Sequence, residues 1–233
     1  MIDLHCHLLP YVDDGANDLN TAMKLLREEA RQRVKALCLT PHLRKGMFET
    51  SDEEIIRQYR RFHPLAKEAG IAAFLSREYH WDRGFREKLR ERDVLTMGKG
   101  NVLLVEFSSL HSREQILEGV ETVCRAGYCP LIAHVERYPA VDLETAERLT
   151  QRGALLQINA GSLLGEEGRR QKKISRKLVE RGLAYVVASD AHDPEERRPN
   201  LEEARQVLGK RYGREQAKAL LEENPLRILR GTV

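Results

Sequence analysis

The chain has 233 residues, and its formal charge of +3 is the small difference between 39 basic and 36 acidic side chains. Charges of both signs in nearly equal numbers exclude a dedicated nucleic-acid binder, and the absence of a run of ~18 uncharged apolar residues excludes membrane insertion. No linker or repeat divides the sequence, so we expect one domain over residues 1–233, and a start without signal-peptide features predicts a cytoplasmic protein.

Apolar runs of strand length alternate with amphipathic segments along the whole chain. The predicted strands are the opening residues up to His5 and His7, then residues 34–40, 71–79 and 101–109. Three more strands are predicted within residues 129–138, leading to His134, within 154–161, ending at Asn159, and within 183–193, where the apolar run stops at Ser189. The predicted helices cover residues 17–33, 51–69, 82–92, 112–126, 142–152, a long basic stretch that ends at Gly182, and helices over 199–230 around a turn at Tyr212 and Gly213. Seven strands, mostly followed by helices, favour an α/β fold with parallel strands. This is either a closed or nearly closed seven-unit barrel or an open doubly wound sheet.

Polar side chains able to bind a metal follow nearly every predicted strand. They are His5, His7, His42, Glu78, Glu106, His134, Asn159, Asp190 and His192. Because parallel barrels carry their sites at the carboxyl ends of the strands, we expect these side chains to lie in one layer. Imidazole and carboxylate ligands without thiolates favour Mn²⁺, with Fe or Mg²⁺ as alternatives, over a structural zinc. His63, His80 and His111 are expected to lie outside the site.

Several short motifs are spaced as in a known family. They are HCHLLPYVDDGA near the start, TPH (40–42), Glu78, VEF (105–107), AHVERY (133–138), QINAGSLLG (157–165), ASDAH (188–192) and ENPLRIL (223–229). Together they resemble the polymerase-and-histidinol-phosphatase (PHP) superfamily, and within it the manganese-dependent bacterial protein-tyrosine phosphatases that act on tyrosine kinases controlling capsule and exopolysaccharide synthesis. The resemblance spans nearly the whole chain and implies a distorted (β/α)7 TIM-like barrel of the PHP type with three metal ions. The chain departs from the family at Arg77 and at Asp193, where the family has a small residue and usually an asparagine.

The resemblance also implies roles for individual residues. The metal ligands would be His5, His7, Asp14, His42, Glu78, Glu106, His134, Asp190 and His192, with Glu106 as the bridge between metals. Asp13 could replace Asp14, since the motif does not separate two adjacent acids. Arg137 would contact phosphate, and so would a second arginine that is either Arg197 or Arg198.

A metal cluster beside arginines points to phosphoryl chemistry. We predict hydrolysis of phosphotyrosine on a protein by hydroxide that the metals generate near neutral pH. The resemblance implies that the protein substrate is a bacterial tyrosine kinase that carries the phosphotyrosine on its tail. The alternatives are a small-molecule phosphatase, such as a histidinol-phosphate phosphatase, and a non-catalytic metal-binding scaffold, which would have no reason to keep so many polar groups in one layer. The sequence leaves the native metal, the physiological substrate and the oligomeric state open.

Cys38 and Arg44 match the Cys-x5-Arg signature of phosphatases that use a cysteine nucleophile. That chemistry needs a low-pKa thiolate in a loop whose backbone N–H groups hold the phosphate. Cys38 instead lies in the apolar run 34–40, no glycine separates it from Arg44, and Pro41 removes one N–H donor. We therefore predict that Cys38 is a core thiol and that the match arises by chance.

Overall fold

Strands and helices alternate along the computed structural model, which describes residues 1–233. The strands are β1 (Ile2–Cys6), β2 (Ala36–Leu39), β3 (His42–Leu43), β4 (Ala72–Leu75), β5 (Glu78–His80), β6 (Val102–Glu106), β7 (Cys129–Ile132), β8 (Leu155–Asn159) and β9 (Val186–Ala188). The helices are α1 (Leu19–Arg31), α2 (Asp52–Glu68), α3 (Arg83–Glu91), α4 (Arg113–Arg125), the 3₁₀ turn η1 (Val135–Arg137), α5 (Leu143–Gln151), α6 (Ala160–Leu164), α7 (Arg169–Glu180), α8 (Leu201–Tyr212), α9 (Arg214–Lys218), the π-helical turn η2 (Ala219–Glu223) and α10 (Asn224–Arg230). This order agrees with the alternation predicted from the sequence.

Two predicted strand regions each contribute to a pair of short strands. Residues 34–40 contain β2, and β3 begins only after Pro41, which has no N–H to donate to a neighbouring strand. Residues 71–79 contain β4 and the start of β5. The pairing continues across both breaks, since the N–H of Glu78 donates to the carbonyl of Pro41 at 3.1 Å. Glu78 therefore begins β5, and the prediction that it ends a strand is wrong.

The strand pairs are all parallel, and they join seven βα units into a ring. Hydrogen-bonded neighbours follow the orders β1-β2-β4 and β3-β5-β6-β7-β8-β9. The chain connects these two sheets directly, because β2 leads into β3 and β4 leads into β5. Next to β1, the N–H of Asp190 donates to His5 O at 2.8 Å, and that of His7 to Ala191 O at 2.8 Å. The first and last units are thus neighbours, as in a distorted (β/α)7 barrel, and the open doubly wound sheet is excluded.

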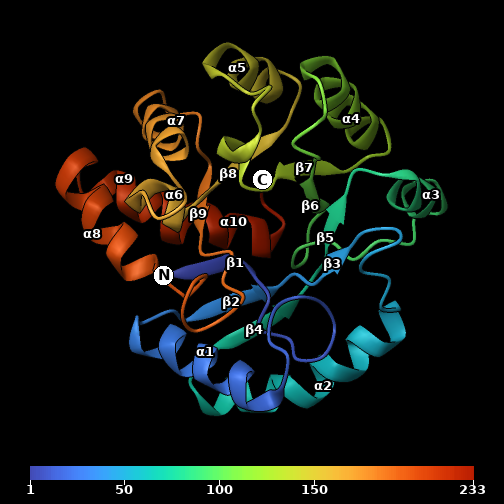
Figure 1. Cartoon of the computed structure of the whole chain (residues 1–233), viewed down its shortest axis with the longest axis vertical. Coiled ribbons are helices and arrows are strands. Elements are labelled where there is room, and N and C mark those ends of the chain that lie inside the picture. Colours follow the sequence, from blue (N-terminus) through green and yellow to red (C-terminus); the bar gives the residue numbers. More distant parts are fainter.

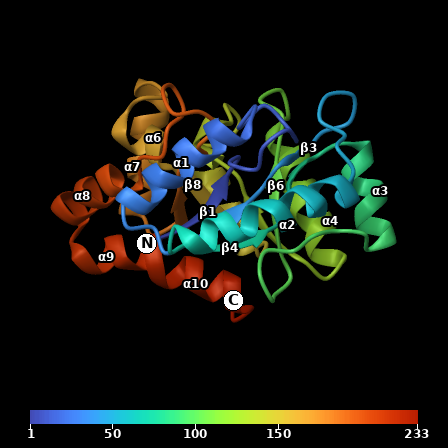
Figure 2. The same cartoon turned by 90° about the horizontal axis from the view of Figure 1, so that it is seen from below.

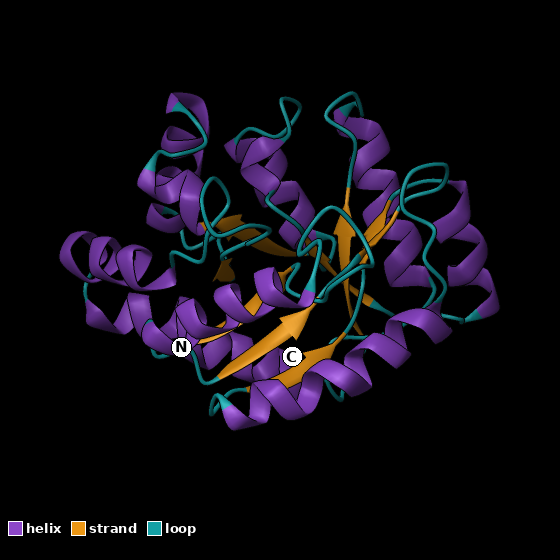
Figure 3. Cartoon of the chain, turned by 60° about the horizontal axis from the view of Figure 1, so that its bottom comes forward, coloured by secondary structure: helices purple, strands orange, loops and turns teal.

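The strands form the centre of the molecule, and the helices surround them (Figure 1). Seen from the side, α9 and α10 run along one end of the barrel (Figure 2), and long loops rise together from its other end (Figure 3). Ile228 and Leu229 of α10 belong to the same buried cluster as Leu4 and Leu104, so α10 closes the amino-terminal end of the barrel. No helix combines the length and the apolar character that a membrane crossing requires.

A bulge in β1 sets the direction of His5, within the strand, and of His7, directly after it. Leu4 packs in the cluster inside the barrel, so strict alternation along the strand would turn His5 and His7 away from the interior. The register of β1 against β2 shifts between Asp3 and Cys6, and such a bulge redirects the side chains beside it. Both histidines are consequently buried at the carboxyl end of the barrel.

The other differences from the predicted elements have local causes. The long basic helix predicted up to Gly182 is two helices, α6 and α7, because the chain turns at Gly165 and Gly168, whose φ angles are 100° and 116°. Of the segment 183–193, whose apolar run was predicted to stop at Ser189, only β9 is a strand, and the chain then turns at Asp190, which has a φ of 55°. A positive φ is incompatible with continuing a strand.

Candidate metal centre

The nine predicted metal ligands lie together at the carboxyl end of the barrel. Eight of them form three overlapping groups, in which the ligand atoms lie within 4.8 Å of one another: His7, Asp14, His42 and His192; His5, His7, Glu78 and Asp190; and His42, Glu78 and Glu106. The ninth, His134, joins the cluster through its Nε2, which is 2.9 Å from Glu78 Oε1. All of these residues except Asp14 and Glu106 are buried.

Glu78 lies at the centre of this cluster. The imidazole nitrogens around its carboxylate are His5 Nε2 at 3.1 Å, His7 Nε2 at 3.3 Å, His42 Nδ1 at 3.0 Å and His134 Nε2 at 2.9 Å. Burial raises the pKa of Glu78, but the imidazoles, His5 first, bring it well below its ordinary value. Glu78 belongs to two of the three groups, whereas Glu106 belongs to one. The geometry therefore favours Glu78 in the bridging role that the resemblance implies for Glu106.

The Nδ1 atoms of His5 and His7 each lie beside a hydrogen-bond acceptor. His5 Nδ1 is 3.1 Å from Gln157 Oε1, and His7 Nδ1 is 2.7 Å from Asp13 Oδ2. An Nδ1–H that donates outward fixes the tautomer and leaves the Nε2 lone pair for a metal. The two Nε2 atoms are 3.1 Å apart and face each other, which suits two ligands of one cation.

The structure separates the two adjacent acids. The side chain of Asp13 is buried, and its Oδ2 accepts hydrogen bonds from His7 and from the backbone N–H of His42 at 3.0 Å. Asp14 instead points its Oδ1 toward His42 Nε2 at 3.4 Å and His192 Nε2 at 3.5 Å. The geometry favours Asp14 as a ligand and Asp13 as the residue that orients His7.

Unpartnered polar atoms indicate that the cluster fits divalent cations. His42 Nδ1, His192 Nε2 and Asp190 Oδ1 are buried and make no hydrogen bond, although an ionisable group lies 3.0 to 3.5 Å from each. Such unsatisfied atoms cost free energy unless a ligand completes them. Burial lowers the pKa of His7, but the neighbouring carboxylates, Asp13 first, raise it to about 10. The carboxylates around His7 therefore favour a positive charge at this point of the cluster. Imidazole and carboxylate donors suit Mn²⁺, Fe or Mg²⁺.

Two of the candidate ligands occupy strained backbone positions. His134 has a φ of 31° and Asp190 a φ of 55°, in the left-handed region that residues other than glycine rarely adopt. Each lies two positions beyond the end of a strand, β7 or β9. Such strain persists where the surrounding structure enforces it, and it is concentrated at functional sites.

Asp190 divides its oxygens between the cluster and two arginines. Its Oδ1 is 3.3 Å from His5 Nε2, while its Oδ2 accepts hydrogen bonds from Arg137 Nη1 at 2.8 Å and Arg197 Nη2 at 2.7 Å. Burial raises the pKa of Asp190, but His5 and both arginines bring it well below its ordinary value. Arg198 points away from the cluster, because its guanidinium pairs with surface carboxylates.

The two departures from the family pattern leave the cluster intact. Arg77 is buried, and its guanidinium donates to Asp52 Oδ1 at 2.7 Å and to the carbonyl of His42 at 2.7 Å, so it supports the backbone of a candidate ligand. Asp193 accepts backbone N–H bonds from residues 195–197. It thereby shapes the turn that carries Arg197.

Three residues border the cluster that the sequence did not assign to the site. His80 was expected outside the site, but its Nδ1 is 2.9 Å from Glu106 Oε2, so that expectation is wrong. Gln157 Oε1 accepts the N–H of His134 at 2.8 Å, and the hydroxyl of Tyr138 is 3.4 Å from His134 Nδ1. Because side chains alternate along β8, Gln157 lies on the same face as Asn159, the polar residue at the end of that strand. This position could identify Gln157 from the sequence. No comparable signal marks Tyr138.

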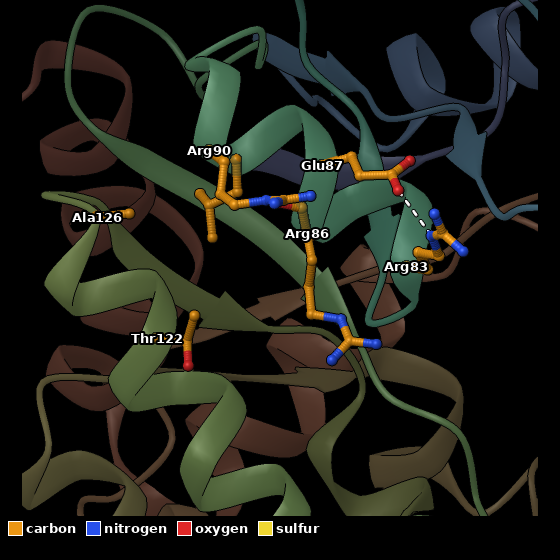
Figure 4. A pocket seen from close by; sticks show the side chains of 7 residues that line it. Arg83, Arg86, Glu87, Arg90, Thr122 and Ala126 are labelled. Atoms are coloured by element: carbon orange, nitrogen blue, oxygen red, sulfur yellow. Dashed lines mark hydrogen bonds and ion pairs between the residues drawn. The ribbon is translucent and has the colours of Figure 1, made fainter.

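A pocket of about 200 Å³ opens beside the cluster. Its lining residues are Arg44, His80, Glu106, Phe107, Ser108, Ser109, His134, Arg137 and Tyr138. A ligand in this pocket would therefore touch the candidate metal centre. A larger pocket of about 400 Å³ lies between α3 and α4, where Arg83 pairs with Glu87 at 2.7 Å (Figure 4). That pocket contains none of the candidate ligands.

Cys38 is a core thiol, as predicted. It is fully buried in β2 and belongs to the same cluster as Leu4 and Leu104. Burial raises its pKa, so it does not supply the thiolate that a cysteine-dependent phosphatase requires.

The chain is similar to known proteins along its whole length. A family model described as capsular polysaccharide synthesis, CpsB/CapC, matches residues 1–230. The tyrosine-protein phosphatase CpsB of Streptococcus pneumoniae is 34% identical over 98% of each chain, and the tyrosine-protein phosphatase YwqE of Bacillus subtilis is 32% identical over 100% of this chain and 93% of its own. A solved structure from the pair YwqE and CpsB, described as unique metal-dependent tyrosine phosphatases, has a TM-score of 0.89 at 30% identity and covers 100% of this chain and 96% of that one. The phosphotriesterase homology protein of Escherichia coli shares the fold, with a TM-score of 0.65 at 12% identity over 98% of each chain.

Proposed function

Because the chain belongs to the CpsB/CapC family and is a metal-dependent tyrosine phosphatase, we propose that its cluster holds three divalent ions and that its pocket takes phosphotyrosine from a protein substrate. The observation that carries this proposal is the set of three overlapping groups of ligand atoms beside a pocket. A non-catalytic scaffold would gain nothing from so many polar groups buried in one layer.

The proposed metal ligands are the nine residues predicted from the sequence, with Glu78 as the bridge. Mn²⁺ is the proposed ion, and Fe or Mg²⁺ would suit the same donors. When bound, such ions polarise the phosphoryl oxygens, make water a better nucleophile and keep it in line with the leaving group. Three divalent ions and the four carboxylates Asp14, Glu78, Glu106 and Asp190 would leave an excess of about two positive charges, which suits a phosphate dianion.

Arg137 and Arg197 have different proposed tasks. Arg137 lines the pocket and donates Nε to Glu167 and Nη1 to Asp190, which leaves its Nη2 for a phosphoryl oxygen. Arg197 donates to the same oxygen of Asp190 and so positions that ligand. Arg198 has no proposed task in the site, because it pairs with surface carboxylates.

The proposed protein substrate is a tyrosine kinase of capsule or exopolysaccharide synthesis. Membership in a family of capsular polysaccharide synthesis supports a substrate in that process, and phosphotyrosine there requires a kinase. We place enzyme and substrate in the cytoplasm, where ATP supports the kinase reaction.

We expect phosphotyrosine peptides to be hydrolysed with a kcat/KM at least about tenfold higher than histidinol phosphate. The pocket is formed partly by the loop that carries Ser108 and Ser109, and it opens beside the cluster without enclosing a small substrate. Steady-state kinetics of one preparation on both substrates provide the ranking, with p-nitrophenyl phosphate as the common reference. Faster hydrolysis of histidinol phosphate would assign the chain to small-molecule chemistry instead.

A further inference from the structure

Arg44 occupies a fixed position directly after β3. Its N–H donates to Phe48 O at 2.9 Å, and its carbonyl accepts the N–H of Phe48 at 2.8 Å, which closes a hairpin with Gly46 at its turn. The ring of Phe48 stacks on the imidazole of His42, with centroids 5.0 Å apart. Since side chains alternate along an extended strand, Arg44 and His42 face the same side. The hairpin therefore holds the guanidinium of Arg44 beside the cluster.

Arg44 differs from the other arginines near the cluster in having a free charge. Arg137 is bound to two carboxylates and Arg197 to one. Arg44 lines the same pocket as Arg137, Glu106 and His134, and its guanidinium forms no ion pair. Its positive charge is thus available to an anion that enters the pocket.

We propose that Arg44 binds the phosphoryl group of the substrate in this pocket. This inference rests on the proposed phosphatase function, because it needs a phosphate at the candidate metal centre. A guanidinium presents two parallel N–H donors that match two phosphoryl oxygens, and this charge-assisted contact is stronger than a neutral hydrogen bond. Arg44 would share the dianion with the Nη2 atom of Arg137. Arg44 of the chance Cys-x5-Arg match would then bind phosphate, whereas Cys38 of the same match would take no part.

The test compares the variant Arg44→Gln with a matched control, the variant Lys45→Gln. Lys45 is the next residue of the same hairpin, is exposed and faces the other side, so its replacement removes the same charge from the same loop. For p-nitrophenyl phosphate we expect Arg44→Gln to lower kcat/KM at least about tenfold and to raise the inhibition constant of inorganic phosphate by a similar factor. Both values should stay within about twofold for Lys45→Gln. Arg44→Lys should recover part of the loss, because it restores the charge but not the two-point contact.

Metal content and thermal unfolding of each variant separate binding from a structural role. Normal metal content and an unchanged unfolding temperature in Arg44→Gln, together with weaker phosphate inhibition, support the proposal. Unchanged kinetics, or a loss of activity that follows a loss of metal, would overturn it. If the wild-type protein hydrolyses no phosphomonoester, the proposed function fails, and calorimetric titration of inorganic phosphate into metal-loaded wild-type and Arg44→Gln protein still decides whether Arg44 binds the anion.

Discussion

Glu78→Gln should lose both its metal and its phosphatase activity. The substitution keeps the shape of the side chain but replaces a carboxylate that lies within 3.3 Å of four imidazole nitrogens by a neutral amide. Because Glu78 belongs to two of the three ligand groups, the expected loss exceeds the ~10–100-fold decrease in metal affinity or activity that removal of an outer-shell partner causes. Elemental analysis of the purified variant and turnover of p-nitrophenyl phosphate measure the two effects.

Glu29→Gln is the matched control for this prediction. Glu29 is another fully buried acid, but it lies outside the cluster, where burial and then Asp3 raise its pKa well above the ordinary value. Glutamine therefore resembles its protonated form, and both metal content and turnover should stay near wild type. A Glu78→Gln protein with full metal content and wild-type turnover would contradict the bridging role of Glu78.

Cys38→Ser should retain most of the phosphatase activity, whereas His42→Ala should lose it. Cys38 is packed inside the barrel, so a hydroxyl there is expected to cost about 1–3 kcal/mol of stability and to leave turnover largely intact. His42 belongs to two ligand groups, so its replacement should remove activity together with bound metal. Thermal unfolding, metal analysis and p-nitrophenyl phosphate kinetics distinguish the two variants. A folded, metal-replete Cys38→Ser protein without activity, or a trapped phosphocysteine, would contradict a metal-based mechanism.

The layer of ligands could be predicted from short-range patterns. Except for Asp14, the candidate ligands lie at or just beyond the end of a predicted apolar run of strand length, and parallel strands bring such positions to the same end of a barrel. Glu106 illustrates this, because it ends a strand whose inward residues, Val102 and Leu104, pack in the barrel core. The alternation that buries these two side chains also carries the carboxylate to the site.

The features that the sequence did not predict depend on contacts between distant residues. The acceptor that fixes the tautomer of His5 is Gln157, which is 152 positions away in the chain. The direction of His5 itself depends on the register shift between β1 and β2, which period-two alternation does not reveal. Arg197 and Arg198 were separable only once the structure showed that Arg197 donates to Asp190, whereas Arg198 pairs with surface carboxylates.

The most direct test of a metal-dependent mechanism combines two measurements on the purified protein, each made before and after chelation. They are elemental analysis and the rate of p-nitrophenyl phosphate hydrolysis. We expect about three divalent ions per chain in the active protein, loss of turnover when they are removed, and recovery on addition of Mn²⁺. A protein that is free of metal by the same analysis and still hydrolyses the substrate at the original rate would contradict the central claim.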